Sequence, residues 1–495
     1  MRLDREQPSG PVRWIALGVI LAVAAAARLW YLTAGIPHAV EIDEPIVVNH
    51  ALRILQTGDW NPHVFNYPTL VIYFHAVLDI ARFLWGALRA EWGSLAAFDM
   101  GAIYRTGRFA GALIGVATVW LTYRLGAELG SRGVALFAAA QLAVRPMHVR
   151  ESHFVLTDVP MTALTVLAMW LALRAGRRST IGAYAWAGAA CGLAAAAKYT
   201  GGVVFVAVAV TWLLHEWRSA DRGLKLGAAA AAAALAFLIA APYTVLDLPS
   251  FLDGFASLFA QFAAPSRTSD PAWVLYAKHL WINGAFELTL ALLAIPIVLV
   301  RGGRAWGPVV AFAAAYFYEL SSHSHVFGRY VLPLLPVICL LSSAAVFELL
   351  TLVARVPSLA RPAARAALLA LVMLGVLYYQ TASTVRWLDA FRRPDTRGIA
   401  ADWLKKNVPK GARLAVENSG PSYLDAAGFK VAGSELLMDH DVNWYRQQHV
   451  EYLVISAADL SQYGDLLASG PTVFQISPTP QRWGPPIRIV NIAGK

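Results

Sequence analysis

The 495-residue chain is 58% hydrophobic and only 15% charged, whereas about a quarter of the residues in a soluble domain are charged. This composition excludes a soluble enzyme and indicates a membrane protein. We assign the formal net charge of +10 to membrane topology rather than to a nucleic-acid partner, because basic residues collect in the short cytoplasmic loops of multispan proteins.

Apolar runs that approach the roughly 20 residues needed to cross a bilayer as helix recur from residue 14 onward. We predict eleven spans, at residues 14–34, 104–123, 133–144, 159–173, 181–197, 201–214, 226–241, 279–300, 306–320, 330–350 and 366–384. Arginines such as Arg177, Arg178, Arg301 and Arg304 lie between these runs. Placing them in the cytoplasm puts the N-terminus inside and the C-terminus outside.

One apolar stretch, residues 69–88, does not fit this path, because a crossing there would invert every later loop. It carries His75, Asp79 and Arg82 at positions i, i+4 and i+7, which share one face of a helix. We therefore predict an amphipathic helix at the outer membrane interface, preceded by a shorter one at residues 44–56.

The chain is predicted to form two domains. Residues 1–385 form an α-helical polytopic membrane domain with a large first outer loop at residues 35–103. Beyond it, β-like runs at 413–417, 452–456, 472–476 and 487–492 alternate with helical patterns at 396–406 and 458–467. Residues 386–495 are therefore expected to be a small extracytoplasmic α/β domain.

Three carboxylates follow the first span in the sequence Glu41-Ile42-Asp43-Glu44-Pro45. A carboxylate sheltered at the membrane–water boundary is suited to act as a general base toward a hydroxyl. Because Pro45 favours a helix start directly after the acids, helix capping by Asp43 or Glu44 is an equal alternative.

A second polar cluster combines Glu151 and His153 with Asp158, just before an apolar helix. Asp158 followed by Pro160 is also a normal helix cap. Acids and histidines beside a membrane helix are nevertheless costly unless they are used. They are candidates to orient an acceptor, to pair with the first acidic cluster or to hold a divalent cation.

Two cations stand at predicted span ends. Lys198 lies between apolar runs beside Gly201 and Gly202, which suits an anionic lipid headgroup. A lysine that snorkels from a span end is the favoured explanation when only its neighbours are considered. Arg329, followed by Tyr330, lies at the outer mouth of a helix, where a guanidinium is able to clamp a phosphate.

Histidines precede Arg329 at positions 323 and 325. His323 and His325 are two residues apart and so are not neighbours on a helix, which argues against a metal pair. Each is more simply explained as a surface residue. No His or Asp spacing in the chain specifies a metal, although a divalent cation remains an open alternative.

Further motifs follow the acidic pair in order: Gly58-Asp59-Trp60-Asn61-Pro62, Asn66-Tyr67-Pro68-Thr69-Leu70 and Tyr104-Arg105-Thr106-Gly107-Arg108. This order resembles the protein O-mannosyltransferase and aminoarabinose-transferase superfamily. Residues 150–160, 195–202 and 328–336 look like later blocks of the same superfamily. The C-terminal domain lies outside the resemblance.

The resemblance implies the multispan GT-C fold and a sugar donor carried on a polyprenyl or dolichyl phosphate. It implies that Asp43 is the base with Glu44 as its acidic neighbour, and that Asp158 is the later outer aspartate. It also implies that Lys198 and Arg329, with Tyr330, contact the lipid phosphate. Glu151, His153, His323 and His325 are candidates to face the acceptor or to support the site.

The chain departs from the superfamily at one motif. Many relatives have Lys-Pro-Pro or His-Pro-Pro where this chain has Asn66-Tyr67-Pro68. The basic donor contact that a relative would supply there is missing. The phosphate clamp is therefore expected to be assembled differently.

These inferences predict an inverting glycosyltransferase that moves a sugar from a polyprenyl phosphate to a hydroxyl acceptor at the outer face of the plasma (inner) membrane. Retention of configuration would need a second carboxylate as nucleophile, for which Glu44 or Asp158 are the candidates. The partners are membrane lipid and an acceptor protein, glycolipid or polysaccharide, and the sugar is open. The competing functions are a multispan transporter and a non-catalytic lipid-binding assembly protein.

Overall fold

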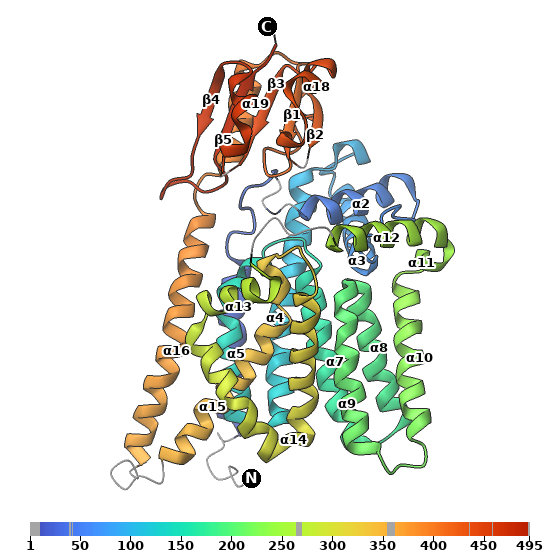
Figure 1. Ribbon diagram of the computed structural model, residues 1–495, viewed down its shortest axis with the longest axis vertical. Coiled ribbons are helices and arrows are strands. Elements are labelled where there is room, and N and C mark those ends of the chain that lie inside the picture. Colours follow the sequence, from blue (N-terminus) through green and yellow to red (C-terminus); the bar gives the residue numbers. More distant parts are fainter. Residues whose placement is uncertain are drawn as a thin grey trace. The chain divides into compact units, whose positions relative to one another are not determined.

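The computed structural model describes residues 10–38, 41, 43–263, 270–353, 362–434, 436–457 and 459–493 (Figure 1). The chain divides into two compact units. The first unit comprises Met1–Trp30, His50–Ala81 and Gly107–Thr384, and the second comprises Tyr31–Asn49, Arg82–Thr106 and Val385–Lys495. Parts of the predicted first outer loop thus group with the C-terminal residues, which the linear division at residue 385 did not anticipate.

The first unit is built of helices. Those that lie wholly inside it are α1 (Gly10–Leu29), α5 (Arg132–Ala143), α6 (Pro146–Glu151), α7 (Asp158–Arg178), α8 (Ile181–Ala197), α9 (Phe205–Glu216), α10 (Arg222–Ala240), α11 (Tyr243–Leu246), α12 (Leu248–Ala263), α13 (Ala272–Ile282), α14 (Ala285–Ser321) and α15 (Leu334–Val353), with short 3-10 helices at Tyr199–Val204 and Gly328–Val331. The helices α2 (Glu44–Thr57), α3 (Leu70–Leu88), α4 (Met100–Leu129) and α16 (Pro362–Phe391) have residues in both units.

Within the described residues, nine helices are long and apolar enough to cross a membrane, and α5 and α8 are shorter apolar helices. The predicted polytopic helical fold is therefore confirmed, while the count of eleven spans stays a prediction. One of the nine is α3, for which the sequence predicted an interfacial position. Its length and apolarity also suit a span, so its placement remains a prediction.

The predicted spans at 279–300 and 306–320 are corrected by α13 and α14. Residues Ala272–Ile282 form a separate helix, and α14 begins only at Ala285. Inside α14, Gly302 has non-helical dihedrals (φ −145°, ψ 34°), so two helical segments meet there in a kink. The two apolar runs are thus real helices, but the chain breaks at Asn283-Gly284 and bends at Gly302.

Close packing of α8 against its neighbours depends on glycine. Helix α8 packs between α7 and α10, as Figure 1 shows. A β-carbon placed on Gly188 would lie 1.9 Å from the carbonyl oxygen of Ala229, and one on Gly192 would lie 2.0 Å from that of Ala233. Small residues four apart let two membrane helices approach through their backbones.

The second unit contains a five-stranded sheet in the order β2-β1-β3-β5-β4. The strands are β1 (Arg413–Glu417), β2 (Lys430–Ser434), β3 (Tyr452–Ile455), β4 (Thr472–Ile476) and β5 (Ile487–Asn491). Strand β1 is parallel to β2 and β3, whereas β5 is antiparallel to β3 and β4. Four of these strands confirm the predicted β-like runs, and β2 was missed.

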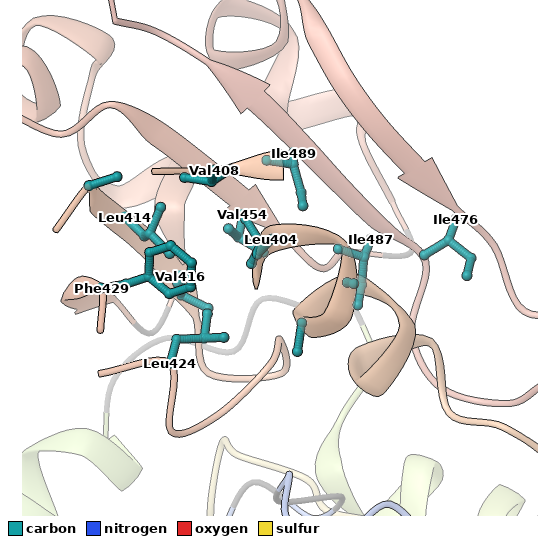
Figure 2. Packing of buried hydrophobic residues seen from close by; sticks show 13 residues of the cluster. Leu404, Val408, Leu414, Val416, Leu424, Phe429, Val454, Ile476, Ile487 and Ile489 are labelled. Carbon is teal, nitrogen blue, oxygen red and sulfur yellow. The ribbon is translucent and has the colours of Figure 1, made fainter. Parts of the chain in front are cut away.

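Alternating side chains of this sheet bury two cores. Figure 2 shows the core that Leu414 and Val416 of β1 form with Leu404 of α17 (Thr396–Asn407). Ala415 points to the opposite face, where Tyr445 of α18 (Val442–Gln447) packs. Successive strand residues point to opposite faces, and each fully buried aliphatic side chain contributes about 1.5–3 kcal/mol.

The predicted helix at 458–467 is shorter than expected. A 3-10 helix at Ser461–Tyr463 runs into α19 (Gly464–Ala468), and residue 458 lies outside the described residues.

Ahead of the sheet, the Asp395 carboxylate accepts a hydrogen bond from the Arg397 backbone N–H at 2.8 Å and caps α17. Such caps define where short helices of a small domain begin.

Candidate active site

Asp158 and two cations form a compact cluster in the first unit. The Lys198 Nζ lies 2.7 Å from Asp158 Oδ1, and the Arg329 Nε lies 3.7 Å from Asp158 Oδ2. The Asp158 side chain is 2% exposed, while those of Lys198 and Arg329 are 12% and 10% exposed. The aspartate thus holds two partly accessible cations side by side.

The cluster decides between alternatives that the sequence left open. Thr157, and not Asp158, is at the N-cap position of α7, and Asp158 is the first residue of the helix, with its carboxylate directed to Lys198. The capping explanation of Asp158 is therefore wrong. Lys198 does not snorkel either, because its ammonium lies between the Asp158 carboxylate and the ring of Tyr330, 3.8 Å from the ring centroid.

Aromatic rings support both cations. The Arg329 guanidinium carbon lies 4.8 Å from the centroid of Phe327 and 5.7 Å from that of Tyr330. Buried Tyr316 donates a hydrogen bond from its hydroxyl to the Tyr330 carbonyl at 3.2 Å. Cations over ring faces are attracted by the ring quadrupole, so the predicted residue Tyr330 orients the cations through its ring.

The glycines after Lys198 shape the backbone. Lys198 is the C-cap of α8 and has extended dihedrals, and its carbonyl accepts from the Gly201 N–H at 2.8 Å. A β-carbon on Gly201 would lie 2.3 Å from the Ala194 carbonyl oxygen. Gly201 is thus needed for the close return of the chain that aims Lys198 at Asp158.

Glu151 and His153 hold the loop between α6 and α7. Both are buried, and Glu151 pairs with Arg150. The His153 ring nitrogens lie 2.8 Å from the Val149 carbonyl and 3.0 Å from the Trp30 carbonyl. Burial lowers the pKa of His153 to about 4, so the neutral ring donates to one carbonyl at a time. An acceptor-facing role for either residue stays a prediction.

His323 and His325 lie near the C-terminal end of α12. His323 Nε2 is 2.8 Å from Glu319 Oε1, and this hydrogen bond raises the pKa of His323. The rings of both histidines contact Phe262, with centroids 4.9 Å and 6.1 Å away. They connect two segments of the first unit. Across the described ranges no group of three or more His, Cys, Asp or Glu residues is arranged to hold a metal.

Asp43 and Glu44 belong to the second unit. Glu44 is the first residue of α2 and is fully buried, while Asp43 lies in the turn before it and is half-buried. The Asp43 carbonyl accepts from the Ile46 N–H at 3.2 Å. Asp43 therefore occupies the position of a helix cap and retains partial access to solvent, so the general-base and capping explanations are compatible.

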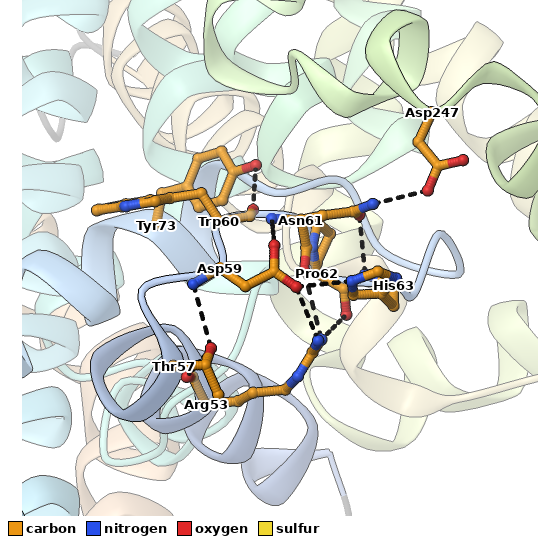
Figure 3. A network of polar contacts seen from close by, with 9 residues as sticks. All are labelled: Arg53, Thr57, Asp59, Trp60, Asn61, Pro62, His63, Tyr73 and Asp247. Atoms are coloured by element: carbon orange, nitrogen blue, oxygen red, sulfur yellow. Dashed lines mark hydrogen bonds and ion pairs between the residues drawn. The ribbon is translucent and has the colours of Figure 1, made fainter.

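Asp59 and Asn61 of the Gly58 to Pro62 motif take part in a network of polar contacts that folds the loop, as Figure 3 shows. The Asp59 carboxylate accepts from Arg53 at 2.9 Å and contacts His63 at 2.8 Å. The hydrogen bond with His63 is the main reason that the pKa of Asp59 is lowered. Asn61 donates to the Asp247 carboxylate at 2.7 Å. This network ties the loop to the start of α12.

Sequence reasoning missed a buried ion pair. Arg145 and Glu287 lie 3.7 Å apart with 3% and 4% of their side chains exposed, and Gln380 donates to Glu287 at 2.6 Å. Beside them lies a narrow pocket, lined in part by Arg145, His279 and Asn283. An ionisable residue inside an apolar run, such as Glu287, was the signal that predicts such a partner.

Comparison with known proteins gives one family match. Residues 98–245 match the family described as dolichyl-phosphate-mannose-protein mannosyltransferase. This stretch contains Asp158 and Lys198, while Asp43 and Arg329 lie outside it. No curated protein sequence matches the chain significantly.

Two solved structures share the fold over most of the chain. ArnT from Cupriavidus metallidurans, bound to undecaprenyl phosphate, has a TM-score of 0.61 at 14% identity, covering 98% of this chain and 99% of that one. The oligosaccharyltransferase AglB from Archaeoglobus fulgidus, in complex with an inhibitory peptide and a dolichol-phosphate, has a TM-score of 0.61 at 13% identity, covering 90% and 69%. The chain therefore has the GT-C glycosyltransferase fold, as the resemblance predicted, with residues 98–245 matching the dolichyl-phosphate-mannose-protein mannosyltransferase family.

Proposed function

We propose that the chain is an inverting glycosyltransferase that moves a sugar from a polyprenyl-phosphate donor to a hydroxyl acceptor. The observation that carries the proposal is the convergence of Lys198 and Arg329 on Asp158. Two cations held by one buried carboxylate at a partly accessible position suit a lipid phosphate. The solved relatives of this fold hold undecaprenyl phosphate and dolichol-phosphate.

The reaction needs little from the protein beyond charge and position. The acceptor oxygen forms a bond to the anomeric carbon while the bond from that carbon to the phosphate oxygen breaks. Lys198 and Arg329 neutralise the charge that grows on the departing polyprenyl phosphate. Asp43 takes the proton of the acceptor hydroxyl. One displacement inverts the anomeric configuration.

The burial of the other carboxylates supports inversion over retention. A retaining mechanism needs a second carboxylate free to attack the anomeric carbon. Glu44 is fully buried at the start of α2, and the oxygens of Asp158 face Lys198 and Arg329. Neither is poised as a nucleophile.

We assign the site to the extracytoplasmic side of the plasma (inner) membrane, and the charge along α7 supports this sidedness. Asp158 begins this 21-residue helix, and Arg177 and Arg178 end it. A helix of that length spans about 30 Å, the thickness of the hydrocarbon core. If the arginines are cytoplasmic, as the positive-inside rule expects, Asp158 faces the opposite side.

The test is transfer of radiolabelled sugar from a panel of polyprenyl-phosphate sugars by the purified protein in native lipid. Wild type is compared with Asp43→Asn and with a control, Asp402→Asn, whose carboxylate is 71% exposed on α17. We expect labelled product from wild type and Asp402→Asn, and its loss in Asp43→Asn. Equal labelling by wild type and both variants would show that Asp43 is not the base. No product from any donor, with folded protein, would overturn the proposal and favour a transporter or a non-catalytic protein.

A further inference from the structure

A tyrosine of the C-terminal domain contacts the segment that carries the predicted base. Within the second unit, the Tyr423 hydroxyl lies 2.6 Å from that of Tyr104 at the start of α4. It also donates to Asn49 Oδ1 at 3.3 Å. Asn49 is on α2, five residues after Glu44. Because a tyrosine hydroxyl has one hydrogen and Tyr423 gives it to Asn49, Tyr104 is the donor to Tyr423.

A second contact lies one residue away. His38 Nδ1 is 3.0 Å from the carbonyl oxygen of Ser422, and His38 is 7% exposed. The contacts of Ser422 and Tyr423 thus bracket the acidic turn, with His38 before it and Asn49 after it. Burial raises the pKa of Tyr423 to about 12, and the nearby carboxylate of Glu44 adds to the rise.

The loop that presents Tyr423 is built rigidly. It follows β1, whose last residue, Glu417, is 2% exposed and accepts from the Ser456 N–H and from the Tyr463 hydroxyl, each at 2.5 Å. The Ser419 hydroxyl donates to the Ser456 carbonyl at 3.0 Å, and the Arg397 guanidinium donates to the Ser419 carbonyl at 2.9 Å. The loop is therefore anchored to the end of β3 and to α17.

The backbone of Tyr423 is itself unusual. Its φ of +58° is in the left-handed region, which a bulky side chain rarely adopts and which costs about 1–3 kcal/mol. Strain of this kind persists where the surroundings determine it and often marks a functional position. Here it directs the ring toward Tyr104, with ring centroids 6.1 Å apart.

From these contacts we propose that Tyr423 is a positioning residue, through which the C-terminal domain holds the first turns of α2 and so the Asp43-Glu44 pair in place for proton removal. This inference rests on the proposed function for its catalytic consequence. Its structural content, that Tyr423 restrains residues 43–49, does not. On this proposal the C-terminal residues support the segment that carries the predicted base.

The experiment compares Tyr423→Phe with Ser469→Ala in the full-length protein. Both variants remove one hydrogen-bonded hydroxyl from the same domain, but the Ser469 hydroxyl donates to the Leu466 carbonyl at 2.6 Å, at the end of α19. We expect Tyr423→Phe to lower kcat about tenfold, since small misplacement of a reacting group costs rate, with the KM for the donor unchanged. Amide hydrogen exchange at residues 43–49 is expected to speed up. Ser469→Ala is expected to lower Tm without either effect.

A double variant adds a second criterion. Tyr104→Phe removes the donor to Tyr423, so the double variant with Tyr423→Phe is expected to lose no more rate than Tyr423→Phe alone. Additive losses would overturn the proposal, as would unchanged exchange at residues 43–49 in Tyr423→Phe or equal effects from Ser469→Ala. If wild type transferred no sugar, the proposed function would fail, and the exchange measurement would still decide whether Tyr423 restrains α2.

Discussion

At the scale of single residues, variants of the Asp158 cluster distinguish effects on protein stability from effects on sugar transfer. Removing one member of a buried ion pair leaves a charge uncompensated and costs about 3–5 kcal/mol, whereas removing both costs much less. We expect Asp158→Asn, which removes the carboxylate that Lys198 and Arg329 share, to lower both Tm and transfer activity, and Lys198→Met with Asp158→Asn to regain part of the lost Tm but none of the activity. Thermal unfolding and sugar transfer, measured on the same preparations, check this. Recovery of activity in the double variant would show that Lys198 serves stability alone.

A second prediction at this scale concerns pH. The hydrogen bond to Glu319 raises the pKa of His323 above its ordinary value of 6.5. A group with a raised folded-state pKa stabilises the fold fully below the unfolded pKa, and this contribution is lost as pH rises through the folded pKa. We therefore expect Tm of the wild type to fall more steeply on passing from mildly acidic to alkaline pH than that of Glu319→Gln. Parallel pH profiles would contradict the pairing.

At the scale of elements, the contact of α8 with α10 is limited by glycine. The β-carbon of Gly188→Ala would meet the Ala229 carbonyl, whereas at Gly182, on the same helix, a β-carbon meets nothing within 4 Å. We expect Gly188→Ala to destabilise the protein by about 1–3 kcal/mol through overpacking. Gly182→Ala is expected to be neutral or slightly stabilising, because alanine favours helix. Denaturation in detergent compares the two, and equal stability would show that α10 shifts freely.

At the scale of the whole molecule, sidedness is the property to test. Arg178 ends α7 and is exposed, and Asp402 is exposed on α17. The two native cysteines, Cys191 and Cys339, are buried, so background labelling is expected to be low. We predict that an impermeant maleimide labels Asp402→Cys in intact cells and labels Arg178→Cys only after lysis. Labelling of both in intact cells, or the reverse pattern, would overturn the proposed topology.

Local pattern carried the prediction of most elements. Four strands and the apolar helices were predicted because a strand or helix shows its periodicity over a few residues. Strand β2 was missed, since Lys430–Ser434 is a short edge strand with a glycine and little apolar alternation. The start of α14 was misplaced, because the apolar run from His279 onward hides the break at Asn283-Gly284.

For the site, residue types at span ends identified Asp158, Lys198 and Arg329 as candidates, but not what they do to one another. The Lys198 and Asp158 side chains meet across 40 residues of chain, which no local pattern records. Tyr423 was not predicted as functional at all. Its isolated position in a loop carries no periodicity, and its φ is visible only in three dimensions.

The sequence by itself determined that this is a polytopic helical protein with a small α/β domain after it, because hydrophobic length and period act locally along the chain. It also determined the fold family through the order of its motifs. The tertiary structure alone decided that Lys198 and Arg329 share Asp158, and that Tyr423 contacts Tyr104 and Asn49. Contacts of this kind arise from packing between distant segments, which depends on the geometry of the whole fold and not on neighbours in sequence.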